Sequence, residues 1–325
     1  LLVAVLVRLP WAAAMSERSP QFDEAAYTSH AELLCEGRGY VDPDGTEADF
    51  WPVGYPAFLA LGYCTLGVSK ATAFGLQILL LSLTCVLMSM IGERSFGPAV
   101  GRSGALLLAL YPNYIFYSSL WLTEPLYTFL LVAVSAMLLA GLGRTRHSIG
   151  FALATGLLAG LAALVRPGAL LLPLLVPAWY VLQKVSWPRT VLTTLIVILT
   201  SLAVISPWMV RNHAVTQPQY EISSNGGLVF WGGNHPDALG GVARPEAVAR
   251  DLAVGTPAYD GREGYRLGLA SITSDLPAAM RRSVQKISYF LAIETDGAMW
   301  NYKGLEDAGR GVVPVVLAGS TYILA

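Results

Sequence analysis

Long uncharged apolar runs, separated by short polar segments, dominate the pattern of this chain. A helix needs about 20 consecutive apolar residues to cross the roughly 30 Å hydrocarbon layer of a bilayer. The runs that meet or approach this length are 71–92, 103–123, 125–143, 148–165, 167–183 and 190–210. The chain also begins and stops within apolar stretches, 1–7 and 312–325, so we expect it to be part of a longer protein. The pattern predicts an all-α polytopic membrane protein with about eight transmembrane helices, the two at the ends truncated.

The short loops predict the orientation of these helices. Loops 93–102, 144–147 and 184–189 carry six basic residues against one acid. Positively charged loops remain in the cytoplasm, so these three are expected on the cytoplasmic side. Residues 15–70, the turns at 118–123 and at Arg166, and the segment from 211 to about 310 then lie on the extracytoplasmic side.

The first outer segment, 15–70, is strongly acidic. Within it, residues 22–36 lack Pro and Gly, which predicts a short surface helix, and the apolar residues 52–68 are expected at the membrane interface. The sequence therefore divides into a transmembrane bundle, 1–210, that contains this acidic loop, an extracytoplasmic region, 211–308, and the start of a further transmembrane helix, 309–325.

The region 211–308 has a mixed composition. Glycines and asparagines, including Gly226 and Gly227, predict two short strand-like pieces joined by tight turns. Two helical stripes follow; they consist of Tyr265, Leu269, Ile272 and Leu276, and of Met280, Val284, Ile287 and Leu291. The second helix carries Arg281, Arg282 and Lys286 on its polar side, which suits a helix lying against phospholipid headgroups.

The composition supports a membrane protein and excludes several classes. The chain is 54% apolar and 13% charged, whereas soluble domains carry about 25% charged residues. A net charge of −1, with no Gly-rich phosphate loop, gives no reason to expect a nucleic-acid partner. The three cysteines show no metal spacing and no disulfide framework, and Cys64 and Cys85 are expected to be small core residues. The four histidines show no metal spacing either, so we expect neither a metal nor a cofactor.

Two acidic positions are candidates for chemistry. Asp23 and Glu24 follow the first span, and Asp23, Tyr27 and His30 are spaced to share one helical face. A carboxylate there can act as a general base toward a hydroxyl or amine, or the two acids can simply favour the start of a helix. Glu124 lies between two uncharged runs, where an acid is costly and tends to be paired or functional; alternatively it caps the helix that Pro125 begins.

Two arginines lie on the same predicted side. Arg166 is at an outer turn, and Arg211 with Asn212 follows Pro207 and Trp208. Such arginines either extend to lipid phosphate or clamp an anionic substrate. The loop charges alone predict this side, and the candidate acids and arginines all fall on it. A base together with several cations at one face favours transfer from a lipid-phosphate carrier, because the cations stabilise the departing phosphate.

The ordered motifs of the chain also resemble a known family. They are Asp23-Glu24-x-x-Tyr27, Glu36-Gly37-Arg38-Gly39-Tyr40, Trp51-Pro52-Val53-Gly54-Tyr55-Pro56, Thr123-Glu124-Pro125-Leu126-Tyr127, Arg166-Pro167, Pro207-Trp208-x-x-Arg211-Asn212, Ser224-Asn225-Gly226-Gly227 and Gly233-Asn234-His235-Pro236. This order is similar to the bacterial branch of the protein O-mannosyltransferase and aminoarabinose transferase superfamily, glycosyltransferases with the GT-C fold. Each motif is weakly specific alone, and the set covers nearly all of the chain.

The resemblance implies an inverting transferase of the bacterial plasma membrane, with its active site on the extracytoplasmic side. It would take a hexosyl or pentosyl group from a polyprenyl-phosphate donor and pass it to a lipid, glycan or protein acceptor, without a metal or cofactor. Asp23 corresponds to the catalytic base, Glu24 to its neighbour and Glu124 to a second active-site acid, while Arg166 or Arg211 would contact the donor phosphate. Other candidate substrate contacts are Tyr27, Asn212, Asn225 and Lys286.

Two other functions remain open at this stage. One is a transporter or flippase for lipid-linked sugars, which predicts polar residues in broken helices at mid-membrane. The apolar runs contain almost no such residues, which counts against it. The other is a non-catalytic partner subunit, which would tolerate the loss of Asp23.

Overall fold

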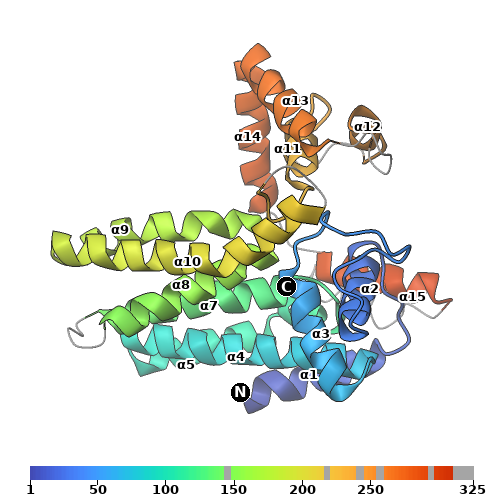
Figure 1. Ribbon diagram of the computed structural model, residues 1–325. Coiled ribbons are helices and arrows are strands. Elements are labelled where there is room, and N and C mark those ends of the chain that lie inside the picture. The colour runs from blue at the N-terminus through green and yellow to red at the C-terminus, as the bar shows by residue number, and fades with distance from the viewer. Residues whose placement is uncertain (143–147, 216–219, 239–244, 254–259, 292–295, 310–325) are drawn as a thin grey trace. The chain divides into compact units, whose positions relative to one another are not determined.

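A computed structural model gives the structure of the chain and describes residues 1–142, 148–215, 220–238, 245–253, 260–291 and 296–309 (Figure 1). The described residues are mostly helical, and the single β-bridge among them joins Val41 to Glu47. They form two compact units. The first comprises residues 1–48, 52–222 and the described part of 295–325, and the second comprises residues 49–51 and 223–294.

A bundle of apolar helices makes up most of the first unit. Its members are α1 (Leu2–Ala14), α4 (Lys70–Phe96), α5 (Pro98–Leu110), α7 (Glu124–Gly141), α8 (Ser148–Val165), α9 (Leu172–Leu182) and α10 (Trp187–Val215). Neighbours contact one another in the order α5, α4, α7, α8, α10 and α9, while α1 packs against α4 and α5 (Figure 1). Glycines allow close approach: Gly92 faces Gly101, and Gly156 and Gly160 of α8 face Thr200 and Val204 of α10. Small residues at helix contacts are typical of membrane bundles.

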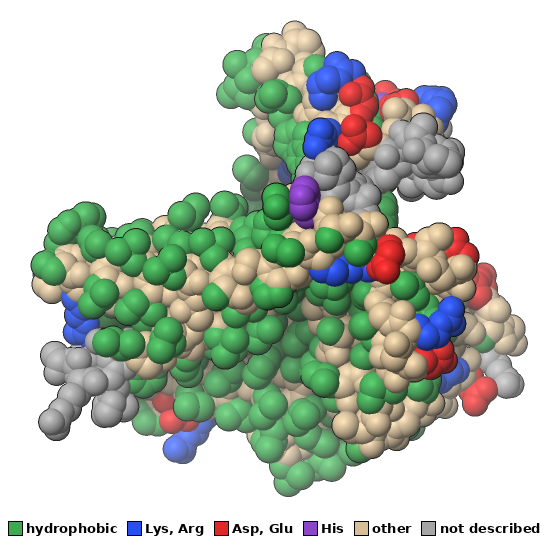
Figure 2. All heavy atoms as spheres, in the orientation of Figure 1, with side chains coloured by type: hydrophobic (Ala, Val, Ile, Leu, Met, Phe, Trp, Pro, Cys, Tyr) green, Lys and Arg blue, Asp and Glu red, His purple; other side chains and the backbone are tan. Residues whose placement is uncertain are grey.

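These helices confirm the all-α polytopic prediction. Within the described part of the chain, α4, α7 and α10 are long and apolar enough to cross a membrane, and α1, α5, 149–165 and 167–182 are shorter apolar helices. Leucines on their outer faces are exposed, and Figure 2 shows hydrophobic side chains covering α8 to α10 in that view. Such a surface requires a lipid environment. The predicted cytoplasmic loop 144–147 lies outside the described residues, as do residues 310–325 of the predicted terminal span, 309–325.

Two of the predicted spans differ from single helices. The run 103–123 ends its main helix at Leu110 and continues as α6 (Pro112–Phe116) and the 3₁₀ turn η1 (Tyr117–Ser119). Pro112 explains the break, because it has no N–H to continue the hydrogen-bond ladder of α5 and restricts the residue before it. Likewise, the run 167–183 starts as a 3₁₀ turn, η2 (Pro167–Leu171), before α9.

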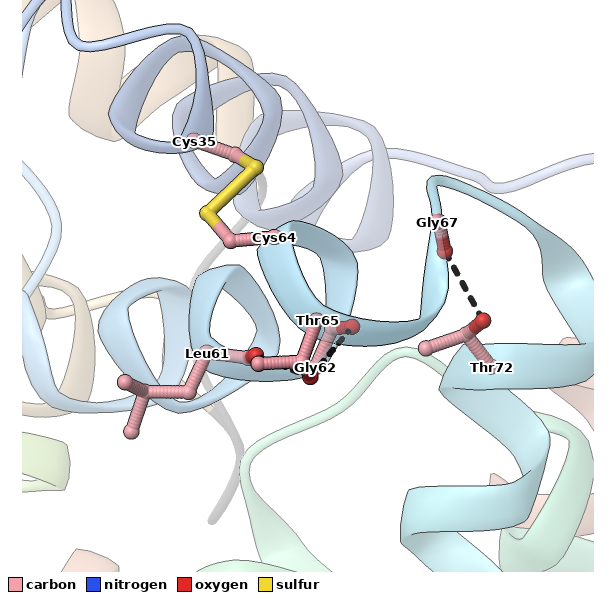
Figure 3. Close-up of a disulfide and its surroundings, with 7 residues drawn as sticks. All are labelled: Cys35, Leu61, Gly62, Cys64, Thr65, Gly67 and Thr72. Atoms are coloured by element: carbon pink, nitrogen blue, oxygen red, sulfur yellow. Dashed lines mark hydrogen bonds between the residues drawn. A yellow bond between two sulfur atoms is a disulfide. The ribbon is translucent and has the colours of Figure 1, made fainter.

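The acidic outer segment contains the predicted surface helix, α2 (Asp23–Cys35), and a second helix, α3 (Gly54–Leu66). A disulfide joins Cys35 at the end of α2 to Cys64 in α3, with 5.3 Å between the Cα atoms (Figure 3). The expectation of no disulfide, with Cys64 as a core residue, is therefore wrong. The pairing could not be recognised in the sequence, because only the packing of α2 against α3 brings together two cysteines that are 29 residues apart. The third cysteine, Cys85, is free and buried.

The second unit contains α11 (Gly226–Asn234), α12 (Pro245–Asp251), α13 (Gly261–Ser274) and α14 (Leu276–Phe290). The strand-like pieces and the tight turn predicted at Gly226 and Gly227 are wrong, since both glycines begin α11. Gly227 meets the backbone of Gly261 and Gly264 in α13, where a side chain would not fit. The glycines thus serve close helix packing rather than a turn.

The predicted amphipathic stripe of α14 is present, but its polar side is not free. Arg282 is buried and donates to Ser271 Oγ of α13 at 3.2 Å, whereas Met280, Val284 and Ile287 are exposed. Within its unit, α14 therefore turns part of its polar side toward α13 and leaves the apolar stripe uncovered.

We predict that the disulfide forms in cells. When membranes are denatured and alkylated without reduction, the Cys85 thiol should be the one that reacts, and reduction should release those of Cys35 and Cys64 as well. Alkylation with a maleimide-linked polymer, followed by gel electrophoresis, counts the thiols. A Cys64→Ser chain is the control and should show two thiols without reduction. Three reactive thiols in the unreduced natural chain would contradict the pairing.

Candidate active site

A buried ion pair organises the outer end of the first unit. Arg18, in the link after α1, and Glu24, in the first turn of α2, are both fully buried. Arg18 Nη1 and Nη2 donate to the two Glu24 carboxylate oxygens at 2.8 and 2.6 Å. This bidentate geometry is the strongest form of an arginine–carboxylate contact.

The remaining hydrogen bonds of the pair join distant segments. Arg18 also donates to Ser119 O at 3.1 Å and to Trp300 O at 3.3 Å, in η1 and in α15 (Asp296–Asp307). Glu24 also accepts from Gln21 N at 2.9 Å and from Trp121 N at 3.0 Å. The pair therefore fixes the start of α2 against the link that leads into α7. Asp23 is the residue before Glu24, and Glu124 lies three residues after Trp121.

Asp23 is half-buried at the start of α2. Burial raises the pKa of its carboxyl above the usual range, and the nearby negative charge of Glu124 raises this pKa further. The Arg166 guanidinium acts in the opposite direction, which places Asp23 within electrostatic reach of both residues. A carboxyl with a raised pKa in such surroundings has the properties of a general base.

Glu124 and Arg166 form an ion pair beside Asp23. Arg166 precedes η2, and its Nη2 donates to Glu124 Oε1 at 2.5 Å while its Nε donates to Thr123 Oγ1 at 2.9 Å. Its guanidinium also lies 5.7 Å from the centre of the Tyr127 ring. The side chains of Glu124 and Arg166 are 36% and 45% exposed, so the pair is accessible to a ligand.

Tyr27 lies on the same side of α2, one turn after Asp23. Burial and the charge of Asp23 raise the pKa of its phenol well above the usual range, which keeps the hydroxyl protonated. Its ring packs edge-on against Tyr55 of α3, with 5.3 Å between ring centres. Four of the predicted site residues, Asp23, Tyr27, Glu124 and Arg166, therefore converge.

Arg211 and Asn212 contact other chain segments of the first unit. Arg211, near the end of α10, donates to Ala48 O at 2.6 Å and to Tyr40 O at 2.7 Å, and it pairs with Glu47. Its guanidinium also lies 4.9 Å from the Trp208 ring centre. Asn212 donates to Glu221 O at 3.0 Å and to Ile222 O at 3.1 Å. These contacts join α10 to residues 40–48 and 221–222, and the predicted contacts of Arg211 and Asn212 with a substrate remain predictions.

Asn225 and Lys286 belong to the second unit. Asn225 precedes α11 and accepts from Ser223 Oγ at 3.0 Å, and the Lys286 ammonium lies near Gly233. Their predicted contacts with substrate remain predictions.

Sequence reasoning missed two residues that build the site. In the sequence, Arg18 is only one of two arginines in the acidic segment 15–70. Gln77 lies within an apolar run, yet it is fully buried and its Nε2 donates to Leu120 O at 2.6 Å and to Tyr55 Oη at 2.8 Å. A lone amide within an uncharged span was the available signal, because such a group must find partners there.

We predict that the Arg18–Glu24 pair is needed for folding. Glu24→Gln leaves the Arg18 charge buried without its counter-ion, which costs about 3–5 kcal/mol. Thermal unfolding in lipid nanodiscs should show a large loss of stability, whereas the control Glu36→Gln, at an exposed acid just after α2, should change little. Arg18→Met combined with Glu24→Leu should recover part of the loss. Equal stability of Glu24→Gln and Glu36→Gln would contradict a structural role of the pair.

For Asp23 we predict a substitution that stabilises the fold, in contrast to Glu24→Gln. Because the folded pKa of Asp23 is raised, the folded state holds the proton more tightly than the unfolded chain, whose carboxyl titrates near pH 4. This contribution favours folding at low pH and is lost as the pH rises from about 4 through the folded pKa. Asp23→Asn removes that loss, so its melting temperature should exceed that of the natural chain increasingly over this range. A difference that is independent of pH would show that the Asp23 pKa is not raised.

Comparison with known proteins places this geometry in context. Residues 51–210 match the family model described as dolichyl-phosphate-mannose-protein mannosyltransferase. The structure is similar to two crystal structures of ArnT from Cupriavidus metallidurans. The apo structure has a TM-score of 0.55 and 16% identity, and the one bound to undecaprenyl phosphate has a TM-score of 0.51 and 15% identity. Each match covers 99% of this chain, and 74% and 75% of the two ArnT chains. No curated protein matches the chain in sequence.

The family match includes Glu124 and Arg166, and the structural match extends to nearly the whole chain. The chain is therefore a multi-pass membrane protein with an ArnT-like fold, and its residues 51–210 are similar to the mannosyltransferase family, in agreement with the resemblance of its motifs.

Proposed function

We propose that the chain is an inverting glycosyltransferase that moves a hexosyl or pentosyl group from a polyprenyl-phosphate donor to an acceptor. The observation that carries this proposal is the position of Asp23 beside the accessible Glu124–Arg166 pair. A base and an anion-binding arginine are the two groups that such a transfer requires. The undecaprenyl phosphate bound by the similar ArnT structure supports a polyprenyl-phosphate donor.

In this mechanism Asp23 accepts the proton of the acceptor hydroxyl or amine. The freed electron pair attacks the anomeric carbon from the side opposite the phosphate, and the new bond to the acceptor forms. The bond between the anomeric carbon and the phosphate oxygen breaks, and its electron pair stays on the phosphate. One displacement inverts the configuration at the anomeric carbon.

Arg166 would bind the phosphate as negative charge builds on it. Its fork of N–H donors suits two phosphate oxygens, and the phosphate would share Arg166 with Glu124. Glu124 would orient the guanidinium before the donor arrives. Glu24 is assigned a positioning role, because its carboxylate is fully buried and bonded to Arg18.

We place this reaction on the extracytoplasmic face of the bacterial plasma membrane. The loop charges favour that side for residues 15–70. The Cys35–Cys64 disulfide supports the same side, since disulfides persist in oxidising compartments. The region 211–308 would then be extracytoplasmic as well.

Asp23→Asn should lower turnover about 10²- to 10⁴-fold, because general-base catalysis supplies roughly that factor. The measurement is release of radiolabelled sugar from an undecaprenyl-phosphate donor by purified protein in nanodiscs. Glu36→Gln, an exposed acid near the far end of the same outer helix, is the control and should keep full activity. Undiminished turnover by Asp23→Asn would exclude Asp23 as the base and would favour a partner subunit or transporter.

Substitutions of Arg166 and Arg211 should have different effects on activity and on stability. Arg166→Gln should reduce kcat/KM for the donor about 10²-fold, the usual effect of losing one donor to a developing anion, with little change in melting temperature. Arg211→Gln should instead lower the melting temperature, because Arg211 binds two backbone carbonyls and Glu47. The reverse pattern would assign the phosphate to Arg211.

A further inference from the structure

A pocket of about 490 Å³ opens between the residue before Asp23 and helix α15. Its lining consists of Phe22, Met299, Trp300, Tyr302, Lys303 and Glu306, and we call it the Phe22 pocket. The volume lies within the range of small-molecule sites, about 300–1,000 Å³. All six residues belong to the first unit, and none of them has a part in the mechanism above.

Phe22 is held in an unusual conformation at the edge of this pocket. Its φ is 41°, in the left-handed region that is rare for a bulky side chain, and 64% of the residue is exposed. The ring packs edge-on against Trp300, with 6.0 Å between ring centres, and the Lys303 ammonium lies 4.2 Å from its centre. A strained residue next to a proposed catalytic group suggests a functional reason for that conformation.

The lining has the chemistry of a saccharide site. Aromatic faces pack against the C–H face of a sugar ring, while a few polar groups at the edge fix its orientation through the hydroxyls. Lys303 can donate to a hydroxyl, and Glu306 can accept from one. Because the charges of Lys303 and Glu306 offset each other, the pocket suits a neutral ring better than an anion. The same two charged groups make it less suited to an apolar acyl chain.

We propose that the Phe22 pocket binds a neutral saccharide ring of the acceptor, next to the base Asp23. This inference rests on the proposed transferase function, and it specifies the acceptor as a carbohydrate. Asp23 has to reach the acceptor hydroxyl, and Phe22 directly precedes Asp23 in the chain. The donor phosphate is proposed at Arg166, whose contacts are with Thr123, Glu124 and Tyr127, none of which lines the pocket.

Binding can be tested without turnover by saturation-transfer NMR. The probes are methyl pyranosides of glucose, galactose, mannose and N-acetylglucosamine, added to the full chain in lipid nanodiscs so that no sugar-headed detergent is present. At least one probe should receive saturation at its ring C–H protons. Trp300→Ala and, separately, Tyr302→Ala should each reduce that signal at least threefold. Tyr289→Ala, at an exposed tyrosine of α14, is the control and should leave it unchanged.

The outcomes separate this inference from the proposed function. Asp23→Asn should retain saccharide binding while losing turnover, and turnover retained by that variant would overturn the base assignment alone. No signal from any probe, or a signal insensitive to both Trp300→Ala and Tyr302→Ala, would overturn the Phe22 pocket. Tyr302 has an exposed side chain, so its variant tests the pocket even if Trp300→Ala fails to fold.

Discussion

The buried ion pair between Arg18 and Glu24 is the constraint on which the outer end of this protein depends. Removing two charges from water is costly, and the cost is tolerated here because every carboxylate oxygen of Glu24 has donors. The hydrogen bonds of the pair reach η1, the link into α7 and α15. A local contact between residues 18 and 24 thereby sets the relative positions of segments more than a hundred residues apart.

That constraint gives Asp23 and Glu124, the two partly buried acids of the candidate site, different surroundings. Glu124 begins α7, and Arg166 provides its counter-ion. Asp23 begins α2 and feels the positive charge of Arg166 without forming an ion pair with that residue. Burial is therefore the dominant effect, and it raises the pKa of Asp23. In the proposed mechanism, Glu124 stays paired with Arg166 until the donor arrives, and Asp23 takes the proton of the acceptor. This division of roles is the pattern expected of acid–base sites.

The sequence predicted the membrane class and also singled out four residues that the structure brings together, Asp23, Tyr27, Glu124 and Arg166. Apolar run length, loop charge and helical spacing can be recognised without knowing the tertiary contacts. Hydrocarbon thickness fixes the length of apolar runs, and loop charge fixes their orientation, so Asp23, Glu124 and Arg166 could be assigned to one face. Contacts between segments could not be predicted in this way. Arg18 is one of two arginines in the acidic segment 15–70, and Cys35 and Cys64 lie 29 residues apart on separate helices. Gly227 signals a turn by composition, yet helix packing against Gly261 and Gly264 determines its conformation.

The central claim is that Asp23 and the Glu124–Arg166 pair face one substrate. The most direct measurement is an electron cryo-microscopy structure of the full chain in nanodiscs with undecaprenyl phosphate added. We expect density for the phosphate within hydrogen-bonding distance of the Arg166 guanidinium, on the side that faces the Asp23 carboxylate. Phosphate density at Arg211, or at any place beyond hydrogen-bonding distance of Arg166, would contradict the account.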